Sequence, residues 1–325
     1  MLVYMLRRLG QSVLAIVAMA VIVFVGVYAL GNPVDILISP EATQLDMEAA
    51  VQRLGLDKPL WEQFTIYVGN VLHGDLGKSF VYGTPALTLI LQRLPATLEL
   101  AFVALALSVL FGVPLGVIAG LKPDTAAGRS IMAGSILGFS LPNFWQGMML
   151  ILVFAVILGW LPAGGRGTMV SVLGVELSVF TADGLAHLIL PALNLALFKM
   201  SLVIRLARAA TREVALQDYV KFARAKGLSE RRIVLMHILK TIMIPITTIL
   251  GLELASMIAF GIVTETVFSW PGMGKLLIDS INLLDRPVIV AYLMLTVFLI
   301  VMINLVVDIL YAVLDPRISL KDMTA

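Results

Sequence analysis

The chain has 325 residues, of which 60% are hydrophobic and only 14% are charged, and its formal net charge at pH 7 is +2. A soluble domain needs more charge than this to cover its surface, so the composition excludes an ordinary water-soluble fold. There is no cysteine, which excludes disulfides, thiol catalysis and cysteine-ligated metals. The three histidines lie far apart in the sequence, and we therefore expect no metal site.

Six stretches are long and apolar enough to cross about 30 Å of hydrocarbon as helices. They cover residues 9–30, 97–121, 131–158, 185–204, 242–264 and 288–313. The first follows a cationic start and resembles a signal peptide in this respect, but it has no obvious cleavage site, so we interpret it as a retained anchor. Pro114, Pro142 and Pro191 fall within or at the ends of spans, where neighbouring helices can satisfy the freed carbonyl groups.

Lysine and arginine are retained on the cytoplasmic side of a membrane, so their distribution orients the chain. With the N-terminus inside, the cytoplasmic segments carry a cluster of nine cationic residues within 205–240, together with Arg7, Arg8, Lys122, Arg129, Arg317 and Lys321. The external segments are more sparsely charged, with Arg53, Lys58, Lys78, Arg93, Arg166, Lys275 and Arg286. The sequence therefore predicts an all-α integral membrane protein with six transmembrane helices and both termini in the cytoplasm.

Three parts follow from these spans. Residues 1–31 form the N-terminus and first helix, and residues 32–96 form an external region with helical patterns at 46–54 and 60–72. Residues 97–325 form a five-helix core that carries a cytoplasmic loop at 206–241. We find no internal repeat of the kind that secondary transporters with inverted halves show.

The cytoplasmic loop has the pattern of a short helix, a sharp turn and a second helix. Gly227 is typical of a residue just past a helix C-terminus, and Ser229 of the N-cap of a second helix that runs into the fifth span. One interpretation is a basic amphipathic segment that lies on anionic lipid headgroups. The other is a helix that inserts into a groove on a cytoplasmic partner. We expect Ala223, Ala225 and Gly227 to be exposed, which favours the partner because close docking needs small side chains.

The loop residues 218–229, Asp-Tyr-Val-Lys-Phe-Ala-Arg-Ala-Lys-Gly-Leu-Ser, resemble the cytoplasmic loop of ABC-importer permeases of the dipeptide/oligopeptide/nickel family. Five further motifs along the chain are similar to the same family, at 54–60, 74–79, 94–100, 267–274 and 314–317. The long region between the first two spans resembles the first of the two permeases that such systems carry. Departures from the family pattern occur at 31–33 (Gly-Asn-Pro) and 284–287 (Leu-Asp-Arg-Pro), and the loop lacks the glutamate of the family's EAA motif.

The resemblance implies the type I ABC importer permease fold in a bacterial inner membrane, surrounded by lipid and without nucleic acid. It implies a second, homologous permease, two cytoplasmic ATPase subunits and an extracytoplasmic substrate-binding protein as partners. It also implies that the loop couples to the ATPases through Tyr219, Phe222, Ala223, Arg224, Ala225, Lys226, Gly227 and Ser229. No Walker A loop is present in the sequence, so we expect no catalytic residue and no cofactor here, with ATP and magnesium bound by the partners.

Polar residues inside spans are the usual indicators of a transport pathway. Glu253 lies near the middle of the fifth span, and it either faces the pathway or is a buried carboxylate with a structural partner. Ser256 and Asn304 are the other pathway candidates. For Lys199 and Asp308 we expect interhelical or interfacial roles. The aromatic segment 264–272 fits either an interfacial belt or an external gate or landing site for the binding protein.

The predicted function is the membrane permease of an ATP-driven importer of dipeptides or oligopeptides. The same importer class could instead carry nickel, glutathione or another small solute. A secondary transporter without an ATPase is the alternative from a different class, and only Glu253 suggests the ionisable relay that it would need.

Overall fold

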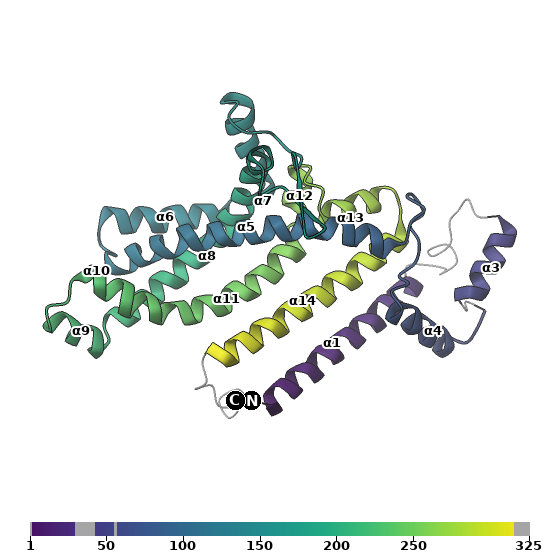
Figure 1. Ribbon diagram of the computed structural model, residues 1–325, viewed down its shortest axis with the longest axis horizontal. Coiled ribbons are helices and arrows are strands. Elements are labelled where there is room, and N and C mark those ends of the chain that lie inside the picture. The colour runs from purple at the N-terminus through teal and green to yellow at the C-terminus, as the bar shows by residue number, and fades with distance from the viewer. Residues whose placement is uncertain (1, 30–42, 55–56, 315–325) are drawn as a thin grey trace. The chain divides into compact units, whose positions relative to one another are not determined.

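The computed structural model describes residues 2–29, 43–54 and 57–314, and these residues are mostly helical (Figure 1). The motif at 31–33 and residues 315–317 and 321 lie outside the described residues, and the motif at 54–60 is described only in part. The chain divides into two compact units. The first comprises Met1–Thr97 and Pro271–Leu305, and the second comprises Leu98–Trp270 and Val306–Ala325.

The first unit confirms both helices expected in the external region. It contains α1 (Leu2–Ala29), α3 (Gln44–Leu54), α4 (Leu60–Leu72), the start of α5 (Ala86–Leu121), α13 (Met273–Asn282) and most of α14 (Arg286–Leu314). The ring of Phe24 on α1 meets Phe64 on α4 edge-on, with centroids 5.3 Å apart. Tyr67 donates a hydrogen bond to the sulfur of Met294 at 2.8 Å. Burial raises the pKa of the Tyr67 hydroxyl to about 12, because the phenolate would lose its hydration.

Asp285 fastens the external loop before α5 to the start of α14. Its side chain is fully buried, and it accepts hydrogen bonds from Ser79 Oγ at 2.5 Å and from the amide of Phe80 at 3.0 Å. Its own carbonyl accepts the amide of Ile289 in the first turn of α14. The departure noted at 284–287 therefore contains a structural aspartate whose carboxylate receives two donors.

The second unit is a helical core with a small external hairpin. After the remainder of α5 it contains α6 (Ala126–Ser140), α7 (Asn143–Leu150), η1 (Ile151–Ile157), β1 (Val170–Val172), β2 (Val175–Leu177), α8 (Ala182–Ala215), α9 (Asp218–Ala225), α10 (Glu230–Ile233), η2 (Val234–Ile238), α11 (Leu239–Phe260) and α12 (Ile262–Val267). The strands are antiparallel, with Val170 opposite Leu177. Figure 1 shows α8 beside α6 and α11.

Glycines bring α5 into close contact with α8. A Cβ atom on Gly116 would lie 2.5 Å from the Cβ of Ala207 and 2.7 Å from the carbonyl oxygen of Ile204. One turn earlier, a Cβ on Gly112 would lie 3.0 Å from Val203. Small residues allow this approach between membrane helices, where packing replaces the hydrophobic effect as the source of association.

The predicted third span is wrong as a single helix. Four described helices are long and apolar enough to cross a membrane, and the number rises to six if each of two bent helix pairs is one span. One of these pairs bends by 106° between Ser140 and Asn143. Leu141 there is extended, with φ −80° and ψ 136°, because a following proline disfavours the helical conformation. Pro142 therefore breaks the span, whereas Pro191 is accommodated within α8.

Two other boundaries differ from the prediction. α5 begins at Ala86, so its first turns occupy the end of the region expected to be external. α8 continues to Ala215, past residue 204, where the fourth span was expected to end. The second loop helix does run into the fifth span, as expected, since α10, η2 and α11 are contiguous, with a bend of 42° just before Pro245.

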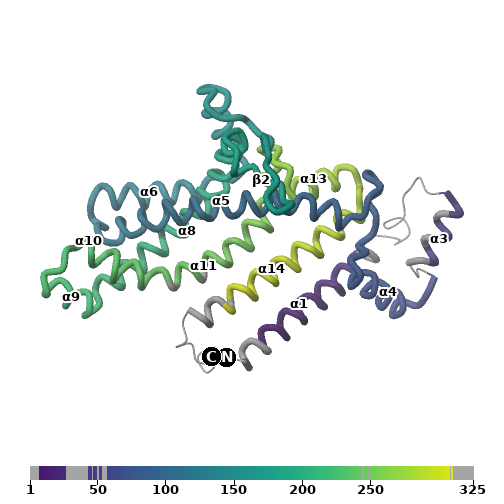
Figure 2. Tube along the Cα trace, in the orientation of Figure 1, coloured from purple at the N-terminus to yellow at the C-terminus, as the bar shows by residue number. Residues whose placement is uncertain are grey.

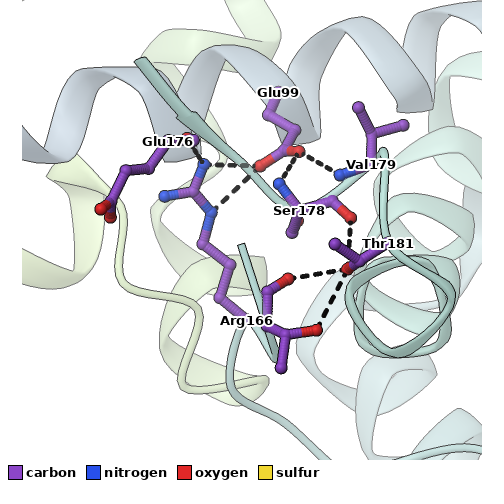
Figure 3. A network of polar contacts seen from close by, with 7 residues as sticks. Glu99, Arg166, Glu176, Ser178, Val179 and Thr181 are labelled. Atoms are coloured by element: carbon purple, nitrogen blue, oxygen red, sulfur yellow. Dashed lines mark hydrogen bonds and ion pairs between the residues drawn. The ribbon is translucent and has the colours of Figure 1, made fainter. Parts of the chain in front are cut away.

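A buried carboxylate on α5 holds the external hairpin in place (Figure 3). Glu99 accepts two hydrogen bonds from the Arg166 guanidinium, at 3.0 and 2.7 Å, and two from the amides of Ser178 and Val179, both at 2.7 Å. Arg166 also donates to the carbonyl of Glu176 at 2.7 Å. Every oxygen of this carboxylate is thus engaged, so the network is a structural clamp.

The aromatic residues that follow α12 pack under the same loop. Phe268 and Trp270 are fully buried. The carbonyl of Phe268 accepts the amide of Gly165 at 2.9 Å, and the Arg166 guanidinium lies 5.7 Å from the centre of the Trp270 ring. Neither ring is available to lipid, so the interpretation of these two residues as an interfacial belt is wrong.

Gly116→Leu is expected to disrupt the packing of α5 on α8. Its side chain would overlap Ala207 and the backbone of α8, and the cost of such overpacking is about 1–3 kcal/mol or more. The melting temperature of the detergent-solubilised protein should fall clearly. Gly134→Leu on α6, whose added Cβ meets nothing within 4 Å, is the matched control. Equal melting temperatures for the two variants would contradict the close contact.

Arg166→Met is expected to destabilise the second unit because it leaves the buried Glu99 carboxylate without its counter-ion. Removing one partner of a buried pair costs about 3–5 kcal/mol. The control is Lys275→Met, which removes a cation from a partly exposed pair with Asp279 and should cost no more than about 1 kcal/mol. Thermal unfolding in detergent and protease cleavage of the hairpin measure both effects, and an intact hairpin in Arg166→Met would argue against the clamp.

Candidate functional site

The cytoplasmic loop contains a short helix, α9, that ends in a well-defined turn. Gly227 has φ +76°, the left-handed conformation that the sequence predicted for it and that glycine adopts without strain. Its amide donates to the carbonyl of Arg224 at 2.9 Å, and the next amide, of Leu228, donates to the carbonyl of Ala223 at 3.2 Å. These two bonds are the Schellman pattern of a helix C-terminus, so the chain reverses sharply from α9 into α10.

One face of α9 is built into the protein's own core. Val220 is fully buried and Ala223 is 5% exposed. Both belong to a cluster of buried aliphatic residues from α5, α8, α10, η2 and α11, whose other members are Val113, Val117, Val203, Ala207, Val214, Ile233, Ile238, Ile242 and Ile246. The expectation that Ala223 is exposed is therefore wrong: its small side chain allows α9 to approach its own chain.

An adjacent side of α9 presents two exposed aromatic side chains. Tyr219 is 45% exposed and Phe222 is 60% exposed. Lys226 Nζ lies 4.5 Å from the centre of the Phe222 ring, and the Tyr219 hydroxyl is 3.2 Å from Thr241 Oγ1. Leu216, Leu235 and Met236 are also exposed. Figure 2 shows that α9 and α10 form one end of this unit, beyond α6 and α11.

The remaining predicted loop residues lie on the surface around this turn. Ala225 and Ser229 are exposed, and Ser229 occupies the N-cap position of α10 without a hydrogen bond from its side chain. Arg224 Nε donates to Glu230 Oε1 at 2.8 Å, which joins α9 to α10. This hydrogen bond raises the pKa of the Arg224 guanidinium above its ordinary value. The ion pair between Arg224 and Glu230 therefore stabilises the turn between α9 and α10.

Glu253 has the structural partner that the sequence left open. Its carboxylate lies 2.5 Å from the ammonium of Lys199 on α8, and the same ammonium donates to Ser256 Oγ, one turn further along α11. The side chains of Lys199 and Glu253 remain 14% and 17% exposed. Two of the pathway candidates, Glu253 and Ser256, thus meet at one lysine that the sequence assigned to interhelical packing.

Asn304, the third candidate, belongs to the first unit, where it lies on α14. Its Oδ1 atom is buried and accepts no hydrogen bond from the described residues. The side chain of Asp308 lies outside the described residues.

A polar cluster that the sequence did not reveal lies beside the broken span. Asn194 Nδ2 on α8 donates to Asn143 Oδ1 at 2.7 Å and to Thr264 Oγ1 at 3.0 Å. It links α7, α8 and α12, and Asn194 itself is fully buried. A polar residue in the middle of an apolar segment was the only available signal. Among the described residues, no group of three or more histidine, aspartate or glutamate side chains could hold a metal ion.

Comparison with known proteins places this architecture in a family. Residues 112–320 match the family of the binding-protein-dependent transport system inner membrane component, and residues 1–101 match the family's N-terminal membrane component. The fold resembles that of an inward-facing methionine ABC transporter, with a TM-score of 0.57 and 18% identity, over 71% of this chain and 98% of that one. This likeness confirms the predicted importer permease fold.

Three relatives show the extent of the similarity. A di/tripeptide transport system permease of Pseudomonas aeruginosa is 39% identical over 98% of this chain and 99% of its own length. An oligopeptide transport system permease of Bacillus subtilis is 39% identical over 98% of this chain and 100% of its own. A glutathione transport system permease of Escherichia coli is 39% identical over 99% and 100%. The chain therefore belongs to the family of inner-membrane components of binding-protein-dependent transport systems.

Proposed function

We propose that this chain is the first permease of an ATP-driven ABC importer for peptides in a bacterial inner membrane. The observation that carries the proposal is its similarity, over essentially its whole length, to permeases named for di/tripeptides and oligopeptides. The glutathione permease that matches equally well carries a substrate of related chemistry, because glutathione is itself a tripeptide. Short peptides are thus the class of substrate that the names of all these relatives have in common.

The permease works with partners that complete the pathway, hydrolyse ATP and deliver the substrate. A second, homologous permease completes the pathway, two cytoplasmic ATPases bind ATP and magnesium, and an extracytoplasmic binding protein delivers the peptide. Both termini and the cationic loop lie in the cytoplasm, in agreement with the distribution of lysine and arginine. The coupling residues of this chain are then those of α9 and the turn that follows it.

The loop transmits ATPase movement because α9 is firmly attached to the spans. Val220 and Ala223 fix it to the aliphatic cluster that includes residues of α5, α8 and α11, while the exposed parts of Tyr219 and Phe222 insert into a groove on the ATPase. Shifting the equilibrium between the inward-open and outward-open states from 1:99 to 99:1 requires about 5.5 kcal/mol of free energy. A helix that packs against the spans and docks on the ATPase can transmit this free energy to the spans, whereas a flexible tether cannot.

The pathway runs past Glu253 and Ser256 on α11, and Asn304 on α14 contributes a further polar group. Polar side chains inside spans face a bundle interior or a water-filled cavity far more often than lipid. These residues are therefore the polar positions that a hydrated peptide would meet on its way through the membrane.

A reconstituted transporter tests the proposed function directly. The chain is assembled in liposomes with its partner permease, ATPases and binding protein, and offered a mixture of synthetic dipeptides to pentapeptides. We expect ATP-dependent uptake of peptides, measured by mass spectrometry of the vesicle contents. Uptake that persists without ATP would indicate a secondary transporter, and uptake of nickel with no peptide would contradict the substrate class.

Phe222→Ala is expected to uncouple ATP hydrolysis from transport without disturbing the fold. A buried aromatic anchor at an interface contributes about 2 kcal/mol or more, so the peptide imported per ATP hydrolysed should fall roughly tenfold or more. Phe180→Ala, at a phenylalanine that is similarly exposed in the external loop, is the matched control. Unchanged uptake by Phe222→Ala would remove α9 from the docking interface.

A further inference from the structure

Two of the ion pairs in the second unit, Arg166 with Glu99 and Lys199 with Glu253, have different surroundings. Glu99 is saturated, since it accepts two hydrogen bonds from Arg166 and two from backbone amides. The exposed fractions of the Arg166 and Glu99 side chains are only 8% and 2%. Because all of its acceptor positions are occupied, the Glu99–Arg166 pair cannot bind a ligand. It serves as the reference for a purely structural ion pair in this protein.

The pair of Lys199 and Glu253 is not saturated. Besides the lysine, the described residues offer Glu253 only a long hydrogen bond from Ser256 Oγ, at 3.4 Å, to the same oxygen, Oε2. The other carboxylate oxygen, Oε1, accepts no hydrogen bond from the described residues. Both charged groups also remain partly exposed in the single chain. The pair therefore retains unused acceptor capacity and access from one side.

That open side cannot face lipid at low cost. Lys199 and Glu253 lie within α8 and α11, two of the apolar segments that cross the membrane. Charged groups at such depths pair with one another and face a bundle interior or a water-filled cavity. Since burying an ion pair is rarely stabilising compared with apolar residues of similar volume, an accessible pair at this position calls for a ligand that uses it.

We propose that Lys199 and Glu253 form a subsite for the two charged termini of a short peptide in transit; the inference rests on the proposed function. Glu253 receives the terminal ammonium and Lys199 the terminal carboxylate. The resting pair has no net charge, and it remains neutral when a zwitterion replaces each partner, so no uncompensated charge is created in a medium of low dielectric. Extended dipeptides and tripeptides span at most roughly 7 to 11 Å, a distance that the opening of a flexible lysine can accommodate.

The chemistry of the subsite disfavours metal cations and anions that lack an amino group. A metal cation would be repelled by the ammonium and would find a single carboxylate, and the described residues contain no cluster of metal-ligating side chains. An anion without an amino group would be repelled by Glu253. A short zwitterion satisfies both groups at once, which assigns the subsite to free dipeptides and tripeptides.

The test compares charge removal with charge exchange in the complete reconstituted transporter. The neutral double variant Lys199→Met/Glu253→Gln is expected to assemble and hydrolyse ATP, but to import roughly tenfold less free dipeptide and tripeptide per ATP, since each lost contact is a hydrogen bond to a charged group. In Glu253→Gln alone, the preference of the wild type for free over N-acetylated dipeptides should shrink. Lys58→Met/Glu62→Gln, which removes an exposed pair on α4, is the matched control.

The exchanged variant Lys199→Glu/Glu253→Lys separates recognition from structure. If the pair were only structural, the exchange would restore uptake to near the wild-type level, and this result would overturn the proposal, as would full uptake by the neutral double variant. Persistent loss of uptake in an assembled, ATP-hydrolysing exchanged complex supports the subsite. Failure of both double variants to assemble would assign a structural role and also overturn it. Absence of peptide uptake by the wild type would instead mean that the proposed function itself is wrong.

Discussion

Hydrocarbon offers no hydrogen-bond partner, so the backbone groups inside the spans of this protein have to be satisfied by the protein itself. The broken third span illustrates the consequence. Where Pro142 ends α6, the carbonyl of Gly138 accepts a hydrogen bond from Gln146 Nε2 at 3.2 Å, and the cluster around Asn194 holds the next helix. The break is compatible with a membrane because side chains from neighbouring turns replace the bonds that the proline removes.

The same constraint explains the close contact of α5 with α8. Helices in lipid gain little from burying apolar surface, so they associate through short backbone distances. Gly112, Gly116 and Gly120 supply these along one face of α5. The aliphatic cluster that holds α9 includes residues of both helices, such as Val113 and Ala207. The position of the cytoplasmic helix is consequently determined by packing inside the spans, and a force on α9 reaches them without passing through a flexible joint.

Much of this architecture could be predicted from the sequence because its signals are local. Apolar length, charge distribution and the turn at Gly227 depend on neighbouring residues alone. Whether Ala223 faces the core or the solvent could not be predicted from neighbouring residues, since a small residue on a helix suits both a docking surface and a crowded core. The break at Pro142 and the continuous helix at Pro191 differ through their neighbours in space. The partner of Glu253 is Lys199, 54 positions earlier in the chain, and no local pattern connects them.

The ion pairs Arg166–Glu99 and Lys199–Glu253 have different physical roles. Glu99 compensates for its burial by collecting four donors and thereby fixing a loop that has little core of its own. Glu253 and Lys199 fix little, since α8 and α11 are already packed against each other by apolar side chains. Replacing such a pair by apolar residues would ordinarily be neutral or stabilising. For this physical reason the pair is proposed to serve a passing substrate and not the stability of this chain.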